Sequence, residues 1–322
     1  MDALQPPAAP FLASPVVTDL NRVEADFAVI GIPYGSPYNM QGVHSDAANA
    51  PTVFRERSRR FSRQLQHYDF DLGGTLFGDT GARLVDCGDL VGDPRDAEGN
   101  KRRATESVRA LLDQGAVPVV LGGDDSIPPL VAGAFEGHRP IQVLQIDAHL
   151  DFRDEVHGIR DGYSSPMRRI SEMPWVGRVV QVGLRGVGSA RPSDVTDARA
   201  AGHVLITAEQ VHTHGPQLLL DQLDPVMPCF LTLDVDGLDP SIAPGTSVPL
   251  PDGLTFRQAS AVFRGVPERC GLAGIDVVEH FPSLDVNNIT SVTIARLLMN
   301  LLAAAARQLH TTAPRDTATS DT

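Results

Sequence analysis

Four short apolar runs in this sequence are each followed by side chains that could do chemistry. These side chains are Asp125 after the run 117–121, Asp147, His149 and Asp151 after 141–146, Asp234 and Asp236 after 229–233, and Glu279 after 272–278. In open α/β sheets, ligands bind beyond the carboxyl ends of the strands. If the apolar runs are parallel strands, these acids and the histidine meet at one edge of the sheet.

Carboxylates that meet inside a protein repel one another, and each is costly to remove from water unless a positive charge lies nearby. A divalent cation meets this requirement. The i, i+2, i+4 spacing of Asp147, His149 and Asp151 places alternate side chains on one side of a strand that runs into a loop. Carboxylates with an imidazole suit ions such as Mn²⁺, whereas Zn²⁺ prefers fewer ligands with more nitrogen or sulfur. Five carboxylates and one histidine are too many for one ion, so the pattern predicts two ions that deprotonate a shared water.

The apolar pattern also indicates the elements that position these residues. Eight short runs bounded by turn residues recur along the chain, at 27–32, 84–87, 117–121, 141–146, 179–182, 203–206, 229–233 and 272–278. Several are β-branched and apolar at consecutive positions, which is typical of strands covered on both faces. Segments with helical periodicity lie between them, most clearly at 104–114, 256–263 and 289–309. The alternation predicts an α/β fold with three layers (α/β/α) around a mainly parallel sheet.

Composition narrows the class of protein. The 322 residues include 27 basic and 40 acidic side chains, and the net charge of −13 argues against nucleic acid or an anionic membrane surface as a partner. Three cysteines are too few for a disulfide framework or a thiolate zinc site, and we expect free thiols. The most apolar stretch, 294–306, contains Arg296 and Asn300 and is too short and polar to cross a bilayer. Residues 1–15 lack the pattern of a signal peptide, so we expect a soluble, cytoplasmic protein.

The strand and helix patterns run along the chain without a repeat or an obvious linker. They predict one domain over residues 16–310. The Pro- and Ala-rich segment 1–15 and the Thr-, Asp- and Ser-rich segment 311–322 are expected to be flexible tails.

Two motifs, in order along the chain, resemble the ureohydrolase family, which includes arginase and agmatinase. The first reads Asp-Ala-His-x-Asp at 147–151, and the second reads Asp-Val-Asp-Gly-Leu-Asp-Pro at 234–240, followed by Pro-Gly-Thr at 244–246. Supporting matches are Ile-Gly-Ile-Pro at 30–33, Asp-Cys-Gly-Asp at 86–89, Gly-Leu-Arg at 183–185 and Glu279. The resemblance runs from about residue 26 to the last helix and implies an arginase-like fold with an eight-stranded, mainly parallel sheet.

The resemblance implies a hydrolase with two divalent ions, Mn²⁺ or alternatively Ni²⁺, that cleaves a guanidinium to urea and an amine. The ligand roles carried over by motif are bridging for Asp147 and Asp234, a further ligand to one ion for Asp151, and ligands to the other ion for His149 and Asp236. Asp151 would also accept a hydrogen bond from a bridging hydroxide, which attacks the guanidinium carbon. Glu279 would hold the guanidinium through a charge-assisted, bidentate pair.

The sequence departs from the family pattern at the third strand end. The family has Gly-Gly-Asp-His-Ser there, with the histidine as a metal ligand, whereas this chain has Asp125. A carboxylate oxygen of Asp and Nδ1 of His lie equally far from Cα, so we expect Asp125 to bind metal in place of the histidine. Five carboxylates around two divalent ions leave one net negative charge, which should raise the pKa of the shared water and favour a harder ion.

A second departure lies in the loop after Asp151. The family usually has a His-Gly pair that helps to move protons to the leaving amine, whereas Tyr163 and Ser164 occupy the corresponding place here. We assign Tyr163 and Ser164 to the substrate pocket. His157, earlier in the loop, is the alternative candidate for the missing acid.

The sequence thus predicts an agmatinase-like amidinohydrolase that acts on a small guanidino compound, and the resemblance implies a homo-oligomer, either a trimer or a hexamer. Two rival hypotheses stay open because of the departures at Asp125 and in the loop. One is a weakly active or non-catalytic subunit that supports an active partner, and the other is a formimino-group hydrolase. A scaffold without metal, with the acids as strand-end turn formers, explains their clustering poorly.

Overall fold

The eight predicted strands form one sheet. The computed structural model describes residues 4–35, 45–93 and 95–312. The strands are β1 Phe27–Gly31, β2 Leu84–Asp89, β3 Val117–Leu121, β4 Ile141–Ile146, β5 Val176–Leu184, β6 Val204–Thr207, β7 Cys229–Asp234 and β8 Leu272–Val278. They lie in the order β2-β1-β3-β8-β7-β4-β5-β6, and all neighbours in this order pair in parallel. The predicted eight-stranded α/β fold is confirmed, and its sheet is parallel throughout.

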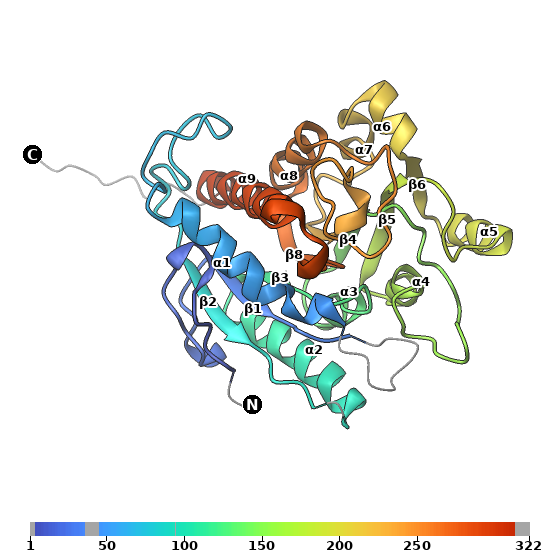
Figure 1. Cartoon of the computed structure of the whole chain (residues 1–322), viewed down its shortest axis with the longest axis horizontal. Coiled ribbons are helices and arrows are strands. Elements are labelled where there is room, and N and C mark those ends of the chain that lie inside the picture. The colour runs from blue at the N-terminus through green and yellow to red at the C-terminus, as the bar shows by residue number, and fades with distance from the viewer. Residues whose placement is uncertain (1–3, 36–44, 94, 313–322) are drawn as a thin grey trace, which may run out of the picture.

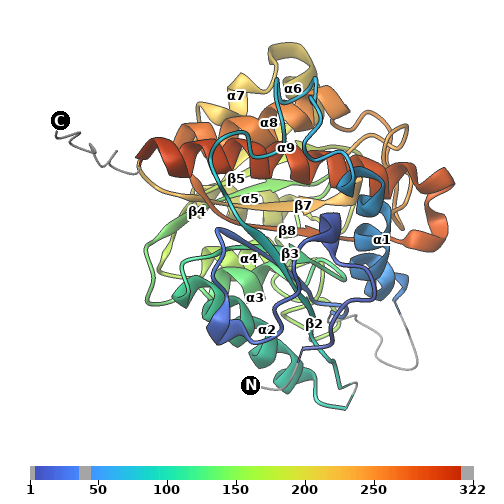
Figure 2. The same cartoon turned by 90° about the vertical axis from the view of Figure 1, so that its left-hand side faces the viewer.

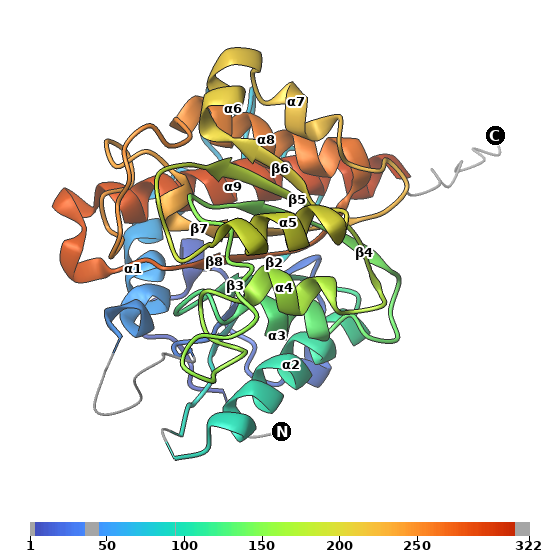
Figure 3. The same cartoon turned by 90° about the vertical axis from the view of Figure 1, so that its right-hand side faces the viewer.

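Helices cover both faces of the sheet, as Figures 2 and 3 show. The α-helices are α1 Ala50–Ser62, α2 Ala97–Asp113, α3 Pro128–Gly133, α4 Pro166–Ser171, α5 Pro192–Ala200, α6 Ala208–His214, α7 Gln217–Leu220, α8 Phe256–Cys270 and α9 Ile289–Thr312. One layer contains α1, α8 and α9 with the short α6 and α7, and the other contains α2, α3, α4 and α5. Each face has its own apolar core, so the strands are buried on both sides, as their unbroken apolar runs predict.

Local sequence signals set the ends of the helices. The Thr255 hydroxyl accepts a hydrogen bond from the Gln258 amide at the start of α8, and Gly271, with a φ of 81°, ends the helix. α8 continues seven residues beyond the predicted end at 263, because Val266 and Pro267 extend its buried face. α2 begins earlier than predicted, because its first turns are polar and the Asp96 carboxylate caps them.

The strand order gathers the segments that carry chemistry. β3, β8, β7 and β4 are consecutive in the middle of the sheet, although they are far apart in the sequence. Figure 2 labels all four strands, and Figure 1 shows β3, β8 and β4 in the different colours of distant segments. Because all four run in the same direction, their carboxyl ends form one continuous edge. This is the edge that the sequence predicts for the acids and the histidine.

The segment before β1 is packed, in contrast to the flexible tail that we expected at 1–15. Within its described part, 4–15, the side chains of Leu4 and Phe11 are buried. Gln5 forms an antiparallel bridge with Asp89 of β2, and the Phe11 amide donates to the Asp86 carboxylate. The physical reason is that β2 is an edge strand, and this segment covers its outer side. Residues 1–3 and 313–322 of the expected tails lie outside the described residues.

The last helix is long and apolar. By length and hydropathy alone, residues 286–309 would suffice to cross a membrane. The stretch 294–306, considered from the sequence, is shorter and would not. However, 78% of the 18-residue apolar window in this segment is buried inside the molecule, where α9 packs against α1 and α8. Burial of this kind is typical of a helix in a protein core. The length and hydropathy of the segment are therefore weak evidence for a membrane span.

Candidate metal centre and active site

A cavity of about 870 Å³ opens at the carboxyl ends of the central strands. Eight of the nine predicted site residues line it, namely Asp125, His149, Asp151, Tyr163, Ser164, Asp234, Asp236 and Glu279. The ninth, Asp147, is fully buried behind the cavity wall. The structure therefore brings the predicted residues together, and it does so from four separate strand ends.

The acids and the histidine form two groups whose possible ligand atoms lie within 4.8 Å of one another. One group consists of Asp125, Asp147 and Asp151, and the other of Asp147, His149 and Asp236. Asp147 belongs to both groups. Asp234 is buried at the same edge but belongs to neither group, and its bridging role stays a prediction.

Asp125 has an environment that suits a metal ligand. Its side chain is buried, and neither carboxylate oxygen has a hydrogen-bond partner within the described structure. Burial, followed by the charges of Asp151 and Asp234, raises the pKa of Asp125 well above the usual carboxyl range. An unpartnered buried carboxylate is costly, and a divalent ion would remove this cost.

The other acids experience the same repulsion. Burial raises the pKa of Asp147 and of Asp234 well above the usual range, and that of Asp151 to about 6, with neighbouring acids adding to the effect in Asp147 and Asp234. The hydrogen bond to Asp236, with His149 Nδ1 3.0 Å from Asp236 Oδ2, raises the pKa of His149. The donor set of oxygens and one imidazole therefore fits two hard divalent ions.

Backbone amides hold several of these carboxylates in place. The Ala148 amide donates to Asp236 Oδ1 at 3.0 Å, and the Asp236 amide donates to Asp234 Oδ1 at 2.8 Å. Gly237 permits this close approach of β7 to β4, because a Cβ atom there would lie 2.6 Å from the Asp147 nitrogen. The Asp-Val-Asp-Gly sequence is thus required locally by the turn as well as by the chemistry.

Glu279 lies at the end of β8, beside the candidate metal ligands. Its Oε1 accepts a hydrogen bond from the Asp125 amide at 2.9 Å, and burial raises its pKa to about 8, with Asp124 contributing further. Both Glu279 and Asp151 have left-handed backbone conformations, with φ of 61° and 43°. This region is unfavourable for residues with a Cβ, and such strain concentrates at functional sites.

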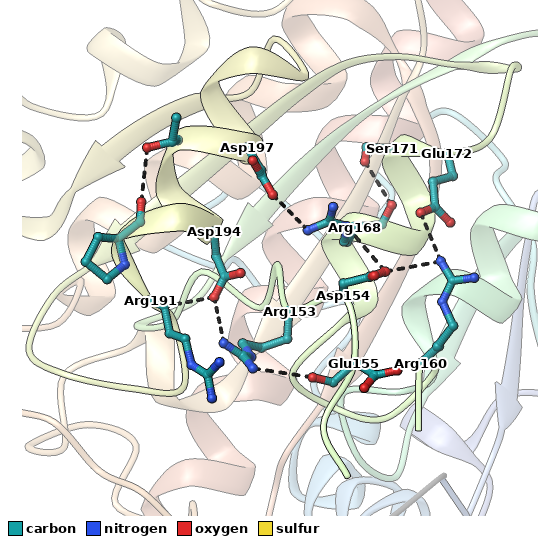
Figure 4. A network of polar contacts seen from close by, with 12 residues as sticks. Arg153, Asp154, Glu155, Arg160, Arg168, Ser171, Glu172, Arg191, Asp194 and Asp197 are labelled. Carbon is teal, nitrogen blue, oxygen red and sulfur yellow. Dashed lines mark hydrogen bonds and ion pairs between the residues drawn. The ribbon is translucent and has the colours of Figure 1, made fainter. Parts of the chain in front are cut away.

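The loop 151–165 brings Tyr163 and Ser164 to the cavity, and an ionic network ties it to α4 and α5 (Figure 4). Arg153 Nη1 lies 3.0 Å from Asp194 Oδ2 at the start of α5, and Arg169 of α4 donates to Asp154. Tyr163 is 40% exposed, whereas Ser164 is buried. His157 is exposed and does not line the cavity, so the structure does not support it as the missing acid.

The rim of the cavity contains residues that the sequence did not predict. They include Asp46 before α1, Val187 after β5, the segment 247–250, and Phe281 after β8. Only 247–250 had a usable signal, since it directly follows the Pro-Gly-Thr motif. Arg185 fixes this segment, because its guanidinium donates to the carbonyls of both Asp236 and Leu250, at 2.6 and 2.8 Å.

The fold and the acid-lined cavity define a three-layer α/β protein with a candidate two-metal centre. Comparison with known proteins identifies the family of this chain. Residues 25–304 match the Arginase family. Agmatinase from Gallus gallus mitochondria is 30% identical, with 92% of this chain and 88% of that protein covered, and the mitochondrial guanidino acid hydrolase of Homo sapiens is 29% identical, with 93% and 86% covered. The structure of proclavaminate amidino hydrolase from Streptomyces clavuligerus superimposes with a TM-score of 0.78 at 28% identity, covering 93% of this chain and 97% of the other. The chain therefore belongs to the arginase family.

Proposed function

We propose that this arginase-family protein is a dinuclear metal-dependent amidinohydrolase that cleaves a small, agmatine-like guanidino compound to urea and an amine. Asp125, Asp147 and Asp151 would hold one ion, and Asp147, His149 and Asp236 the other, with Asp234 as a second bridging ligand. Two divalent ions bound there would acidify a shared water and stabilise the charge of the tetrahedral intermediate. The observation that carries the proposal is the pair of ligand groups that share Asp147.

The residues of the chain would position the two reactants. The Glu279 carboxylate would accept N–H bonds from the guanidinium, and Asp151 would accept a hydrogen bond from the attacking water and orient its oxygen toward the guanidinium carbon. The water oxygen would form a bond to this carbon and the bond from carbon to the substituted nitrogen would break. Both protons of the water would end on this departing nitrogen, giving neutral urea and a protonated amine. Ser164 and Tyr163 would contact the substrate from the side of the cavity.

The charge of the cavity supports a substrate with a cationic or neutral tail. Among the described residues that line it there is no lysine or arginine, and Asp46 lies at the rim. The tail carboxylate of a guanidino acid would thus have no cationic partner there, whereas the amine of agmatine would have Asp46. This is why we favour agmatine over guanidino acids, although relatives of both names are similar to the chain.

Metal analysis and urea release test the proposal together. Protein reconstituted with Mn²⁺ or Ni²⁺ is expected to hold two ions per chain and to release urea from agmatine faster than from guanidinobutyrate or butylguanidine, which have a similar chain length. No urea from any guanidino compound at full metal occupancy would contradict an amidinohydrolase. That result would favour the non-catalytic subunit, for which Asp125 and Tyr163 are the supporting departures, and formamide release from a formimino compound would favour the third hypothesis.

Three further properties belong to this proposal. We infer Mn²⁺ as the principal ion because the donor set is rich in carboxylates, with Ni²⁺ as the alternative. We also propose a homo-oligomer, trimeric or hexameric, located in the cytoplasm. Light scattering of the metal-loaded protein measures the oligomeric state, and cell fractionation measures the location.

A further inference from the structure

A second row of polar side chains lies beneath the proposed ligands, on the same face of the sheet. Gln145 precedes Asp147 by two residues on β4, so both side chains point to the same side. Gln181 of β5 is directly opposite Gln145 in the strand register, and both glutamines are fully buried. Buried amides of this kind are tolerated only when their hydrogen bonds are made.

These side chains form a continuous hydrogen-bonded chain that ends on Asp147. His203 Nδ1 lies 2.9 Å from Gln181 Oε1, Gln181 Nε2 lies 2.7 Å from Gln145 Oε1, and Gln145 Nε2 donates to Asp147 Oδ2. The chain thus crosses three neighbouring segments of the sheet, from the residue before β6 to β4.

The direction of the chain is fixed by groups that have only one hydrogen-bonding role. Gln181 Nε2 also lies 2.7 Å from the Leu150 carbonyl, which can only accept, so this nitrogen must be the amide donor. Gln181 Oε1 therefore faces His203, and His203 must donate from Nδ1. Its other nitrogen, Nε2, is buried and has no hydrogen-bond partner among the described residues, which suits a neutral ring. Burial lowers the pKa of His203 to about 4.

The chain fixes two points of the candidate metal centre. Gln145 holds Oδ2 of Asp147, while the His149 amide holds Oδ1. Gln181 holds the Leu150 carbonyl, which lies between His149 and Asp151 in the sequence. A neutral donor is suited to this place, because it orients a carboxylate without adding charge to a centre that already has an excess of acids.

We propose that His203, Gln181 and Gln145 are positioning residues that orient Asp147 for both metal ions. This inference rests on the proposed function, since it requires Asp147 to be a ligand. It predicts that the loss of any one member weakens metal binding, and that the effect decreases with distance from Asp147. Partners of this kind typically contribute 10- to 100-fold in metal affinity, so about this range applies to Gln145.

Gln142 provides a matched control on the same strand. It is also fully buried, but its amide bonds to the carbonyls of Asp224 and Met227 at the end of β4 away from the cavity. Gln142→Leu and Gln145→Leu remove the same group from the same strand, so both should lower the unfolding temperature of the metal-free protein. Only the second should also weaken metal binding.

The experiment titrates Mn²⁺ into the metal-free full-length protein and records the electron paramagnetic resonance spectrum of the bound ions. Wild type and Gln142→Leu are expected to bind two ions with equal affinity and the same spectrum. Gln145→Leu should bind about 10- to 100-fold more weakly, with an altered spectrum, and Gln181→Leu and His203→Phe should show the same change in decreasing size. The two distant variants keep the test decisive if Gln145→Leu does not fold.

Two outcomes overturn the inference, and they differ in whether the proposed function fails as well. If wild type binds two ions and Gln145→Leu binds them equally well, or Gln142→Leu loses as much affinity, the chain has no positioning role while the proposed function stands. If wild type binds neither Mn²⁺ nor Ni²⁺, the proposed function fails and the inference fails with it.

Discussion

Two groups of acids in this sheet have their charges compensated in different ways. On the edge strand β2, Asp86 and Asp89 receive the guanidinium of Arg55 from α1, with Nε 2.8 Å from Asp86 Oδ2. Arg55 is itself only 1% exposed. At the carboxyl ends of the central strands, a larger group of acids has His149 as its only ion-pair partner within the described structure.

The difference separates a structural role from a functional one. At β2 the chain supplies its own cation, so the two acids are satisfied as soon as the protein folds. At the central strands the chain supplies too little positive charge, and under the proposed function metal ions from solution would supply the rest. Removing one charge should therefore impair folding at the edge and function at the centre, and the following experiments test this contrast.

The largest effect is expected from Asp147→Asn. The variant should lose at least about 10³-fold in urea release and most of its bound metal, because each tenfold loss of rate corresponds to only about 1.4 kcal/mol. Its metal-free form should be at least as stable as wild type, since one buried, repelled carboxylate is gone. Metal analysis, a urea assay and thermal unfolding measure these properties, and an Asp147→Asn protein that retained both metals would contradict the proposed centre.

Arg55→Met should have the opposite outcome. It leaves the buried Asp86 and the half-buried Asp89 without a cation, which is expected to cost about 3 to 5 kcal/mol of unfolding free energy. Urea-induced unfolding measures the loss. Metal content per folded molecule should stay unchanged, and Arg55→Lys, which keeps the charge, serves as the control. A fully stable Arg55→Met would show that the two groups do not differ as described.

The pH dependence of stability should distinguish the metal-free protein from the loaded one. In the metal-free fold the pKa of Asp151 is about 6 and that of Glu279 about 8, both above their unfolded values near about 4. The folded state thus holds more protons in this window, and stability falls as pH rises, by up to about 1.4 kcal/mol per pH unit for each proton. Thermal unfolding between pH 5 and 8 with and without Mn²⁺ is the measurement. The fall should be much smaller with metal, and equal slopes would contradict the assignment.

Asp125→His tests the charge of the centre. The change removes one negative charge, so the pKa of the attacking water should fall and the low-pH limb of kcat/KM should shift down by about one pH unit. Metal affinity should change in the same variant. An unchanged profile and metal content would mean that Asp125 is not a ligand, and Asp124→Asn, at a residue whose carboxylate accepts from Ser126, is the neighbouring control.

The smallest effect is expected at the rim. Asp46→Asn should raise KM for agmatine about two- to fivefold, because an exposed ion pair contributes about 0.2 to 1 kcal/mol. KM for butylguanidine, which has no charged tail, should stay the same. Equal changes for both compounds would remove the proposed role of Asp46 and leave the metal centre untouched.

The fold and the candidate metal centre were predictable from the sequence to different extents. The eight strands were predictable because parallel strands buried on both faces have unbroken apolar runs. The gathering of the candidate ligands was predictable because they directly follow those runs. The rim residues Asp46, Val187 and Phe281 were not, because loops have no periodicity and their approach depends on the strand order. The packing of Phe11 was missed for a related reason, since it depends on which strand forms the edge.

The left-handed conformations of Asp151 and Glu279 have a consequence for protein engineering. Glycine at either position would relieve backbone strain of about 1 to 2 kcal/mol, so a screen for thermal tolerance alone would tend to select it. Each glycine that such a screen selects at these two positions would remove an acid from the candidate centre. Each round of selection for heat resistance in this protein therefore has to include an activity assay.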